Sequence, residues 1–116
     1  MVRTKVIDIH NSKHYTWGAD CDSWVLASLT GLSVKQEIMP PGSKEQLHYH
    51  HNAQQFFYVL KGEATFYADN HKHILKPLQG ISVIPGVKHF IANETETDIE
   101  FLVISNPTIG NDRVNL

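Results

Sequence analysis

The sequence predicts an all-β domain, built as a sandwich or a closed barrel, and three observations support this prediction. Short runs rich in β-branched and aromatic residues recur along the chain, and Gly, Pro and Asn/Asp separate them. The connections between these runs are brief, and there is little sign of helical periodicity. A chain of 116 residues is long enough for one domain but too short for two. We therefore expect about eight to ten short strands in a single domain.

The chain begins with an aromatic, turn-rich segment, "HYTWGADCDSW", at residues 14–24. We interpret it as an arm that packs over one end of the barrel or across a partner subunit. The alternative is that its two tryptophans simply fill the core. The expected organisation is an N-terminal arm and first strands at residues 1–30, the barrel at 31–106 and a C-terminal extension at 107–116. In that extension, Arg113 is a candidate to pair with an acidic group on a partner.

The central strands follow from alternation and from turn residues. Residues 32–38 place Leu32, Val34, Gln36 and Ile38 on one face and Ser33, Lys35 and Glu37 on the other. This strand ends at residues 40–42, Pro-Pro-Gly, which cannot continue a ladder. Residues 56–75 then predict a strand, a break at Gly62, a second strand, a tight turn at Asp69-Asn70 and a third strand. Residues 80–93 and 98–105 supply at least two more strands.

Composition and charge exclude several classes of protein. Ten basic residues face twelve acidic ones without any Lys/Arg cluster, so we expect no nucleic-acid partner and no binding to an anionic membrane. No apolar run approaches the ~20 residues that span a bilayer. The N-terminus lacks the apolar core of a signal peptide, and a single cysteine, Cys21, cannot form an internal disulfide. These features predict a cytoplasmic protein.

Three histidines form a candidate metal site. His48 and His50 lie two residues apart, so on a strand their side chains share one face, roughly 6–7 Å apart at the backbone. His89 completes the group if its strand, "VKHFIAN", runs antiparallel beside the first. Three protein ligands with open positions are typical of a catalytic or ligand-binding metal rather than a closed structural site. Because ligating histidines must be neutral, we expect metal affinity to fall as the pH drops through about 6.

Two motifs resemble those of the cupin superfamily. The first spans residues 42–62, where Gly42, His48, His50 and Gly62 fall at the family positions and Gln55 stands where the family usually has glutamate. The second spans residues 80–93 and matches at Gly80, Pro85, Gly86, His89 and Asn93, although its Gly80–Pro85 interval is one residue shorter than usual. Together the motifs cover about residues 34–104.

The resemblance implies a double-stranded β-helix, a jelly-roll barrel that holds a metal inside its mouth. The family's ligands correspond to His48, His50 and His89, and its fourth ligand corresponds to Gln55. Parity places Gln55 on the inward face with Phe57 and Val59. A neutral glutamine leaves the site about one charge more positive than a carboxylate does, which favours an anionic substrate. Gln55 either binds the ion directly or holds a water or substrate beside it.

Other candidates have less support from the pattern. His51 and Tyr49 point outward, and His71 and His73 lie beside the Asp69-Asn70 turn without nearby residues that complete a site. Glu45 and Gln46 lie on the approach to the pocket, where we favour a solvated loop. Cys21 has no histidine close in sequence and is more typical of a buried residue than of a nucleophile.

The expected function is that of a small metal-binding cupin, an enzyme acting on a small polar or anionic metabolite. Dioxygenase, isomerase and lyase chemistry stay open, because fold does not choose among reactions. The alternative is a non-catalytic cupin that binds or senses a small ligand. The expected cofactor is one divalent transition metal ion, with Fe, Mn, Ni, Cu and Zn not distinguished by spacing. Open sheet edges and the aromatic arm predict a homodimer.

Overall fold

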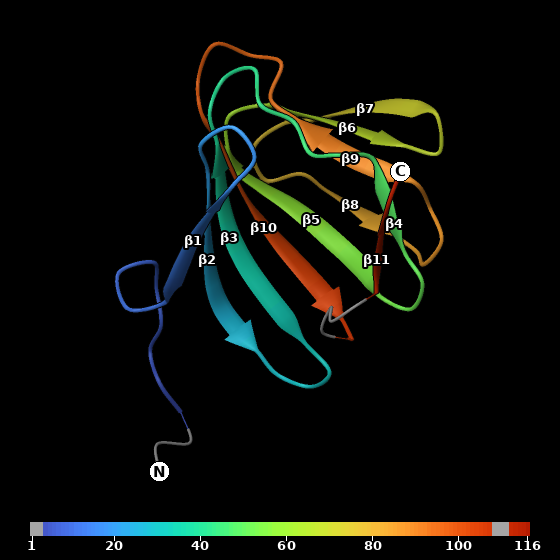
Figure 1. The fold of residues 1–116 in the computed structure, drawn as a ribbon. Helices are drawn as coiled ribbons and strands as arrows, with labels where there is room; N and C mark the ends of the chain where they lie inside the picture. Colours follow the sequence, from blue (N-terminus) through green and yellow to red (C-terminus); the bar gives the residue numbers. More distant parts are fainter. Residues whose placement is uncertain (1–3, 108–111) are drawn as a thin grey trace.

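The computed structural model describes residues 4–107 and 112–116, which form two facing antiparallel β-sheets (Figure 1). Residues 1–3 and 108–111, which belong to the expected arm and extension, lie outside the described residues. The strands are β1 (Lys13–Trp17), β2 (Cys21–Ser28), β3 (Ser33–Met39), β4 (His48–His50), β5 (Gln54–Lys61), β6 (Ala64–Ala68), β7 (His71–Leu75), β8 (Gly80–Val83), β9 (His89–Ala92), β10 (Ile99–Asn106) and β11 (Arg113–Asn115).

One sheet has six strands in the order β1-β2-β3-β10-β5-β8, and the other has five in the order β11-β4-β9-β6-β7. Every described strand pair is antiparallel. Strands that are consecutive in the chain, such as β3, β4 and β5, alternate between the sheets, so the chain winds as a double-stranded β-helix. The all-β prediction is confirmed. The described residues also contain no helix of the length and apolar character that crossing a membrane requires.

Part of the N-terminal segment belongs to the main sheet. β1 pairs with β2, and β2 pairs with β3, so residues 13–28 extend the six-stranded sheet by two strands. With these strands and β11, the described residues hold eleven strands, more than the eight to ten expected. Trp17 and Trp24 are each only half-buried, and Trp17 packs against the edge of the core. The interpretation of both tryptophans as core residues is therefore wrong.

The core lies between the two sheets, where alternate residues of each strand point inward. Phe57, Phe66 and Phe101 are its largest fully buried side chains, and the rings of Phe57 and Phe66 lie 4.7 Å apart, centroid to centroid. In β5, Gln55, Phe57 and Val59 are buried while Gln54 and Phe56 are exposed, as parity predicts.

Two predicted chain reversals are confirmed. Asp69 and Asn70 both have positive φ, 54° and 64°, and form the two-residue hairpin between β6 and β7. Gly62 has φ of 79° between β5 and β6, and a Cβ at this position would lie only 2.7 Å from the carbonyl oxygen of Asp98. Glycine at position 62 is therefore required by both backbone conformation and space.

The ends of the two motifs are joined by hydrogen bonds. The Gly86 N–H donates to the His50 carbonyl at 2.8 Å, which connects the Pro-Gly turn to β4. Asn93 is fully buried, and its Nδ2 donates to the carbonyls of Met39 and Thr97 at 2.9 and 2.8 Å. The Gly86 contact holds the turn before β9 against β4, β4 and β9 pair at His48 and His89, and the three histidines lie on these two strands.

Candidate metal centre

The three histidines converge because β4 and β9 are neighbours in the five-stranded sheet. His48 is paired directly with His89 across the antiparallel ladder, and His50 follows two residues later on the same face of β4. Each offers a ring nitrogen that lies within 4.8 Å of the other two. Their exposed fractions are 1%, 4% and 1% for His48, His50 and His89. The three side chains predicted from the sequence are thus brought together and could hold one metal ion.

Backbone carbonyls set the tautomers of two of these rings. His48 Nδ1 lies 2.7 Å from the Gln46 carbonyl oxygen, and His89 Nδ1 lies 2.8 Å from the Val87 carbonyl oxygen. A carbonyl only accepts, so each Nδ1 carries the proton and donates it. In the neutral rings, the Nε2 atoms then hold lone pairs, which is the state a metal ligand needs.

Burial keeps the histidines neutral. Desolvation lowers the pKa of His48 to about 3 and that of His50 to about 4, and it also lowers the pKa of His89. The positive charge of Arg113 acts in the same direction on all three. The site is therefore ready to bind a cation without first losing protons at neutral pH.

His50 is positioned by the C-terminal strand. β11 pairs with β4. The Asp112 carboxylate, just before β11, accepts hydrogen bonds from the Asn52 and Ala53 N–H groups at 2.9 Å each. His50 Nδ1 lies 3.9 Å from Asp112 Oδ2 and is buried without a hydrogen-bond partner. Desolvation raises the pKa of Asp112, but the N–H donors together lower it by more, so the pKa is lowered overall and the carboxylate stays ionised beside His50.

Gln55 faces the histidines, as parity predicts, while Gln54 is exposed. Its Nε2 donates to Ser105 Oγ at 3.1 Å, and its Oε1 lies 3.1 Å from His89 Nε2. Since His89 carries its proton on Nδ1, the neutral ring presents a lone pair to an oxygen that also offers only lone pairs. Gln55 Oε1 and His89 Nε2 are therefore two acceptors in close contact with no hydrogen atom to share between them.

A cation is the natural partner for such a pair of acceptors. Two ligand atoms that each lie ~2.1 Å from one ion, at right angles, are ~3 Å apart, close to the observed 3.1 Å. His48, His50, His89 and the Gln55 oxygen supply three nitrogens and one oxygen, a set that suits the divalent transition metals. The residues present therefore fit a metal ion.

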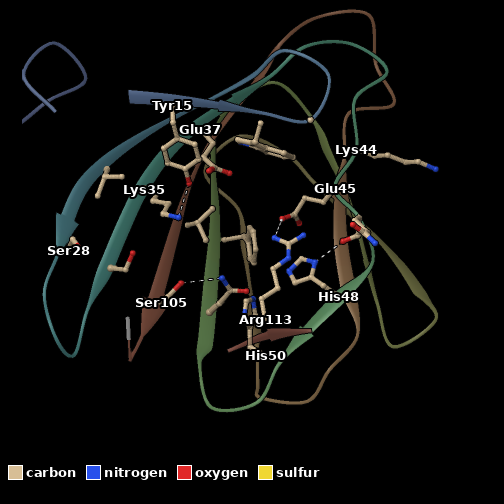
Figure 2. A pocket seen from close by; sticks show the side chains of 18 of the residues that line it. Tyr15, Ser28, Lys35, Glu37, Lys44, Glu45, His48, His50, Ser105 and Arg113 are labelled. Carbon is tan, nitrogen blue, oxygen red and sulfur yellow. Dashed lines mark hydrogen bonds and ion pairs between the residues drawn. The ribbon is translucent and has the colours of Figure 1, made fainter. Parts of the chain in front are cut away.

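His48, His50 and Gln55 line a cavity of about 850 Å³ between the two sheets, within the range of small-molecule sites, and His89 lies behind them against Gln55 (Figure 2). Its walls carry both apolar and charged groups. The cationic side chains are those of Lys13, Lys35, Lys44 and Arg113, and the carboxylates are those of Glu37 and Glu45. Lys13 and Lys44 are exposed, and Figure 2 shows the Lys44 side chain directed away from the cavity, so Lys35 and Arg113 are the cations that face Glu37 and Glu45.

Glu45 and Arg113 form an ion pair beside the histidines. Arg113 Nη1 lies 3.6 Å from Glu45 Oε2, and Glu45 Oε1 accepts the Ile91 N–H at 3.3 Å (Figure 2). Burial raises the pKa of Glu45 to about 7, although the charge of Arg113 opposes the increase. The expectation of a solvated loop at Glu45 is wrong, because the side chain is only 12% exposed. The acidic partner of Arg113 is in its own chain, contrary to the sequence-based expectation.

The polar face of β3 also lines the cavity. Ser33, Lys35 and Glu37 point inward, and Glu37 is only 7% exposed. Desolvation raises its pKa, with a partial opposing effect of Ser23 and Lys35. Sequence reasoning separated the two faces of this strand but did not assign the polar face to the interior. The alternation of polar and apolar residues along this strand was the sequence feature that could have indicated an enclosed polar face.

The remaining candidates lie outside the cluster. His51, His71 and His73 are exposed, and among the described residues only His48, His50 and His89 form a group of metal-binding side chains. Cys21 is buried in the core, as expected, and burial raises the pKa of its thiol. A raised pKa disfavours the thiolate, so the structure gives Cys21 no nucleophilic character.

Fold and site together define a small double-stranded β-helix protein with a histidine cluster in its cavity. A family model described as a cupin domain matches residues 35–105, and the chain belongs to this family. The resemblance seen in the two motifs is thereby confirmed.

Two curated proteins are similar in sequence. An uncharacterised protein of Methanocaldococcus jannaschii is 30% identical over 80 residues, which cover 69% of this chain and 64% of the relative. An oxalate-binding protein of Thermotoga maritima is 38% identical over 69 residues, which cover 57% of this chain and 54% of the relative. The similarity thus spans less than two thirds of either relative.

Solved structures share the fold. KdgF from Halomonas sp. superposes with a TM-score of 0.85 at 16% identity, covering 93% of this chain and 97% of the other. A predicted oxalate decarboxylase from Thermotoga maritima gives a TM-score of 0.80 at 23% identity, covering 89% and 99%. At these identities the likeness concerns the fold alone.

Proposed function

We propose that this cupin binds one divalent transition metal ion and uses it to act on a small polar or anionic metabolite. The ligands in this proposal are His48, His50, His89 and the amide oxygen of Gln55. The ion is one of Fe, Mn, Ni, Cu or Zn. When bound, it supplies a Lewis acid that polarises an oxygen of the substrate or activates water.

One observation carries the proposal: the two facing acceptors, Gln55 Oε1 and His89 Nε2, 3.1 Å apart. In this orientation Gln55 Nε2 donates to Ser105 Oγ at 3.1 Å, and because a hydroxyl also donates, Ser105 is compatible with the reversed amide as well. The reversed amide would instead donate N–H to His89 Nε2 and would suit a site without metal. Metal content therefore distinguishes the two arrangements.

The other cavity residues support an anionic ligand. Lys35 and Arg113 line the cavity, and a bound divalent ion beside a neutral Gln55 adds positive charge, so a carboxylate or phosphate is attracted into it. Arg113 presents several N–H donors, of which Nε donates to Asn115 and Nη1 faces Glu45. Glu45, with its pKa near 7, is suited to hold or release a proton next to such a ligand. Phe57 provides an apolar wall that limits water.

The alternative is a cupin that binds or senses a small anion without turnover. The Thermotoga maritima relative carries the name oxalate-binding protein, which supports this class as well. Both alternatives require the same metal site and differ in whether the ligand is converted.

Elemental analysis of protein purified without chelator and without a polyhistidine tag tests the proposal. We expect about one equivalent of a transition metal, and less than about a tenth of an equivalent would refute metal binding. His50→Ala and His89→Ala should each abolish metal binding while the fold persists. His73→Ala, an exposed histidine on β7, is the matched control. Metal content that survived both site substitutions would refute the ligand assignment.

We further propose a homodimer in the cytoplasm. Exposed apolar side chains, including Val6 before β1 and Leu29 after β2 at 87% and 62% exposure, support association. Light scattering at low concentration tests the oligomeric state, and a monomer at every concentration would refute the dimer.

A further inference from the structure

The cavity has a second polar wall, opposite the histidines, that the proposed metal site does not use. This wall is formed by β1 to β3 of the six-stranded sheet, whereas the histidines and Arg113 come from the five-stranded sheet. Figure 2 shows Lys35 and Tyr15 on one side of the cavity, with His48, Glu45 and Arg113 on the other. Lys35 thus lies across the same cavity from the histidines.

Lys35 is a half-buried ammonium group that has a neutral partner. Its Nζ donates to the Tyr15 hydroxyl at 2.8 Å and lies 5.3 Å from the centroid of the Tyr15 ring. An ammonium group has three N–H donors, and this contact uses one of them. None of the ion pairs between described residues involves Lys35. Two N–H donors of this ammonium group are therefore available to an anion that enters the cavity.

The neighbouring residues keep this group available. Glu37 lies two residues along the same face of β3, but burial raises its pKa and weakens it as a counter-ion. Tyr15, on the edge strand β1, also lines the cavity. Its hydroxyl accepts a hydrogen bond from Lys35 Nζ and so fixes the position of the ammonium group. The position is thus a prepared site for an oxyanion rather than a solvated lysine.

We propose that Lys35 and the Tyr15 hydroxyl form an anion-binding subsite for the far end of a bifunctional ligand. The near end of the ligand binds at the histidine cluster beside Arg113, so the inference rests on the proposed function and specifies its substrate class. The ligand is a small dianion with two oxyanion groups, carboxylate or phosphate, on a short chain. A cavity of about 850 Å³ has room for such a chain, which a single metal-binding group does not need.

The test compares ligands that differ only in the far group. Protein loaded with one equivalent of Co(II) is titrated calorimetrically with glutarate, with 4-phosphonobutyrate and with the monoanion butyrate, which share a three-carbon chain and a carboxylate, while the visible absorption of Co(II) reports binding of the near end. We expect glutarate, 4-phosphonobutyrate or both to bind at least about tenfold more tightly than butyrate. The dianion with the higher affinity identifies the far group as carboxylate or phosphate.

Substitutions then locate the subsite. Lys35→Met should reduce the affinity for the dianion to that for butyrate and leave the butyrate affinity unchanged. Lys35→Arg should retain most of the preference, and Tyr15→Phe should lose part of it, because the ammonium is no longer held. Lys61→Met, which removes the same charge from an exposed position at the end of β5, is the control.

Equal affinities for dianion and monoanion in the wild type would overturn the inference, as would a preference that survives in Lys35→Met. If Lys35→Met does not fold, the wild-type comparison and Tyr15→Phe still decide the matter. Cobalt stoichiometry is measured first and separately. A protein that takes up no metal refutes the proposed function, whereas a loaded protein without the preference refutes only the Lys35 subsite.

Discussion

The buried Glu45 gives a prediction whose size follows from the structure. Burial raises its pKa in the folded protein to about 7, against an ordinary value of 4.5 in an unfolded chain. Because the folded state holds this proton more tightly, Glu45 contributes stability that is fully present below pH 4.5 and is lost as the pH rises through 7. Each unit of difference corresponds to about 1.4 kcal/mol, so the loss is roughly 3 kcal/mol in total.

Glu45→Gln removes the titration and keeps the shape. The amide oxygen still accepts from Ile91 N–H or from Arg113. The difference in free energy of unfolding, wild type minus variant, should therefore fall by roughly 3 kcal/mol between pH 4.5 and about 7.5. Contributions of other titrating groups are common to both proteins and cancel in this difference.

The assay is urea unfolding of the chelator-treated, metal-free proteins, followed by circular dichroism at several pH values in this range. Glu63→Gln, the same substitution at an exposed position between β5 and β6, is the control. A flat difference for Glu45→Gln, or one that rises with pH, would refute the reasoning about this buried carboxylate.

Three further predictions follow from the site and the turns. Metal affinity should stay level from pH 7 to about 5 and fall as the pH drops through about 4, rather than about 6, because burial lowers the pKa values of His48 and His50 to about 3 and about 4. A competition assay with a coloured chelator measures this affinity, and a midpoint near pH 6 would contradict the prediction. Gln55→Glu should raise metal affinity roughly tenfold and weaken binding of butyrate, since the carboxylate removes one unit of positive charge from the site. Calorimetry measures both affinities, and unchanged values would show that residue 55 does not contact the ion. Gly62→Ala should destabilise the protein by about 3 kcal/mol and Gly42→Ala by only about 1 kcal/mol, because both glycines have φ near 79° but only a Cβ at residue 62 meets neighbouring atoms. Equal losses of free energy of unfolding in urea would exclude the close contact with Asp98 as the cause.

The sequence by itself determined most of the fold and the centre of the site. Alternation along β5 identified Gln55 as the inward glutamine, and the spacing of His48 and His50 placed both on one face. Glycine and Asx residues identified the reversals at Gly62 and Asp69-Asn70. These features depend on neighbours within a few residues, where the two-residue period of a strand and the need for positive φ act directly.

Contacts between distant segments were decided only by the tertiary structure. The pairing of β11 with β4 brings Arg113 to Glu45 and Asp112 to His50, although more than sixty residues separate these segments in the chain. Sheet order also turned the polar face of β3 inward, and it placed Lys35 across the cavity from the histidines. Periodicity shows that a strand has two faces, but only the packing of the second sheet decides which face is enclosed and which charges lose their water.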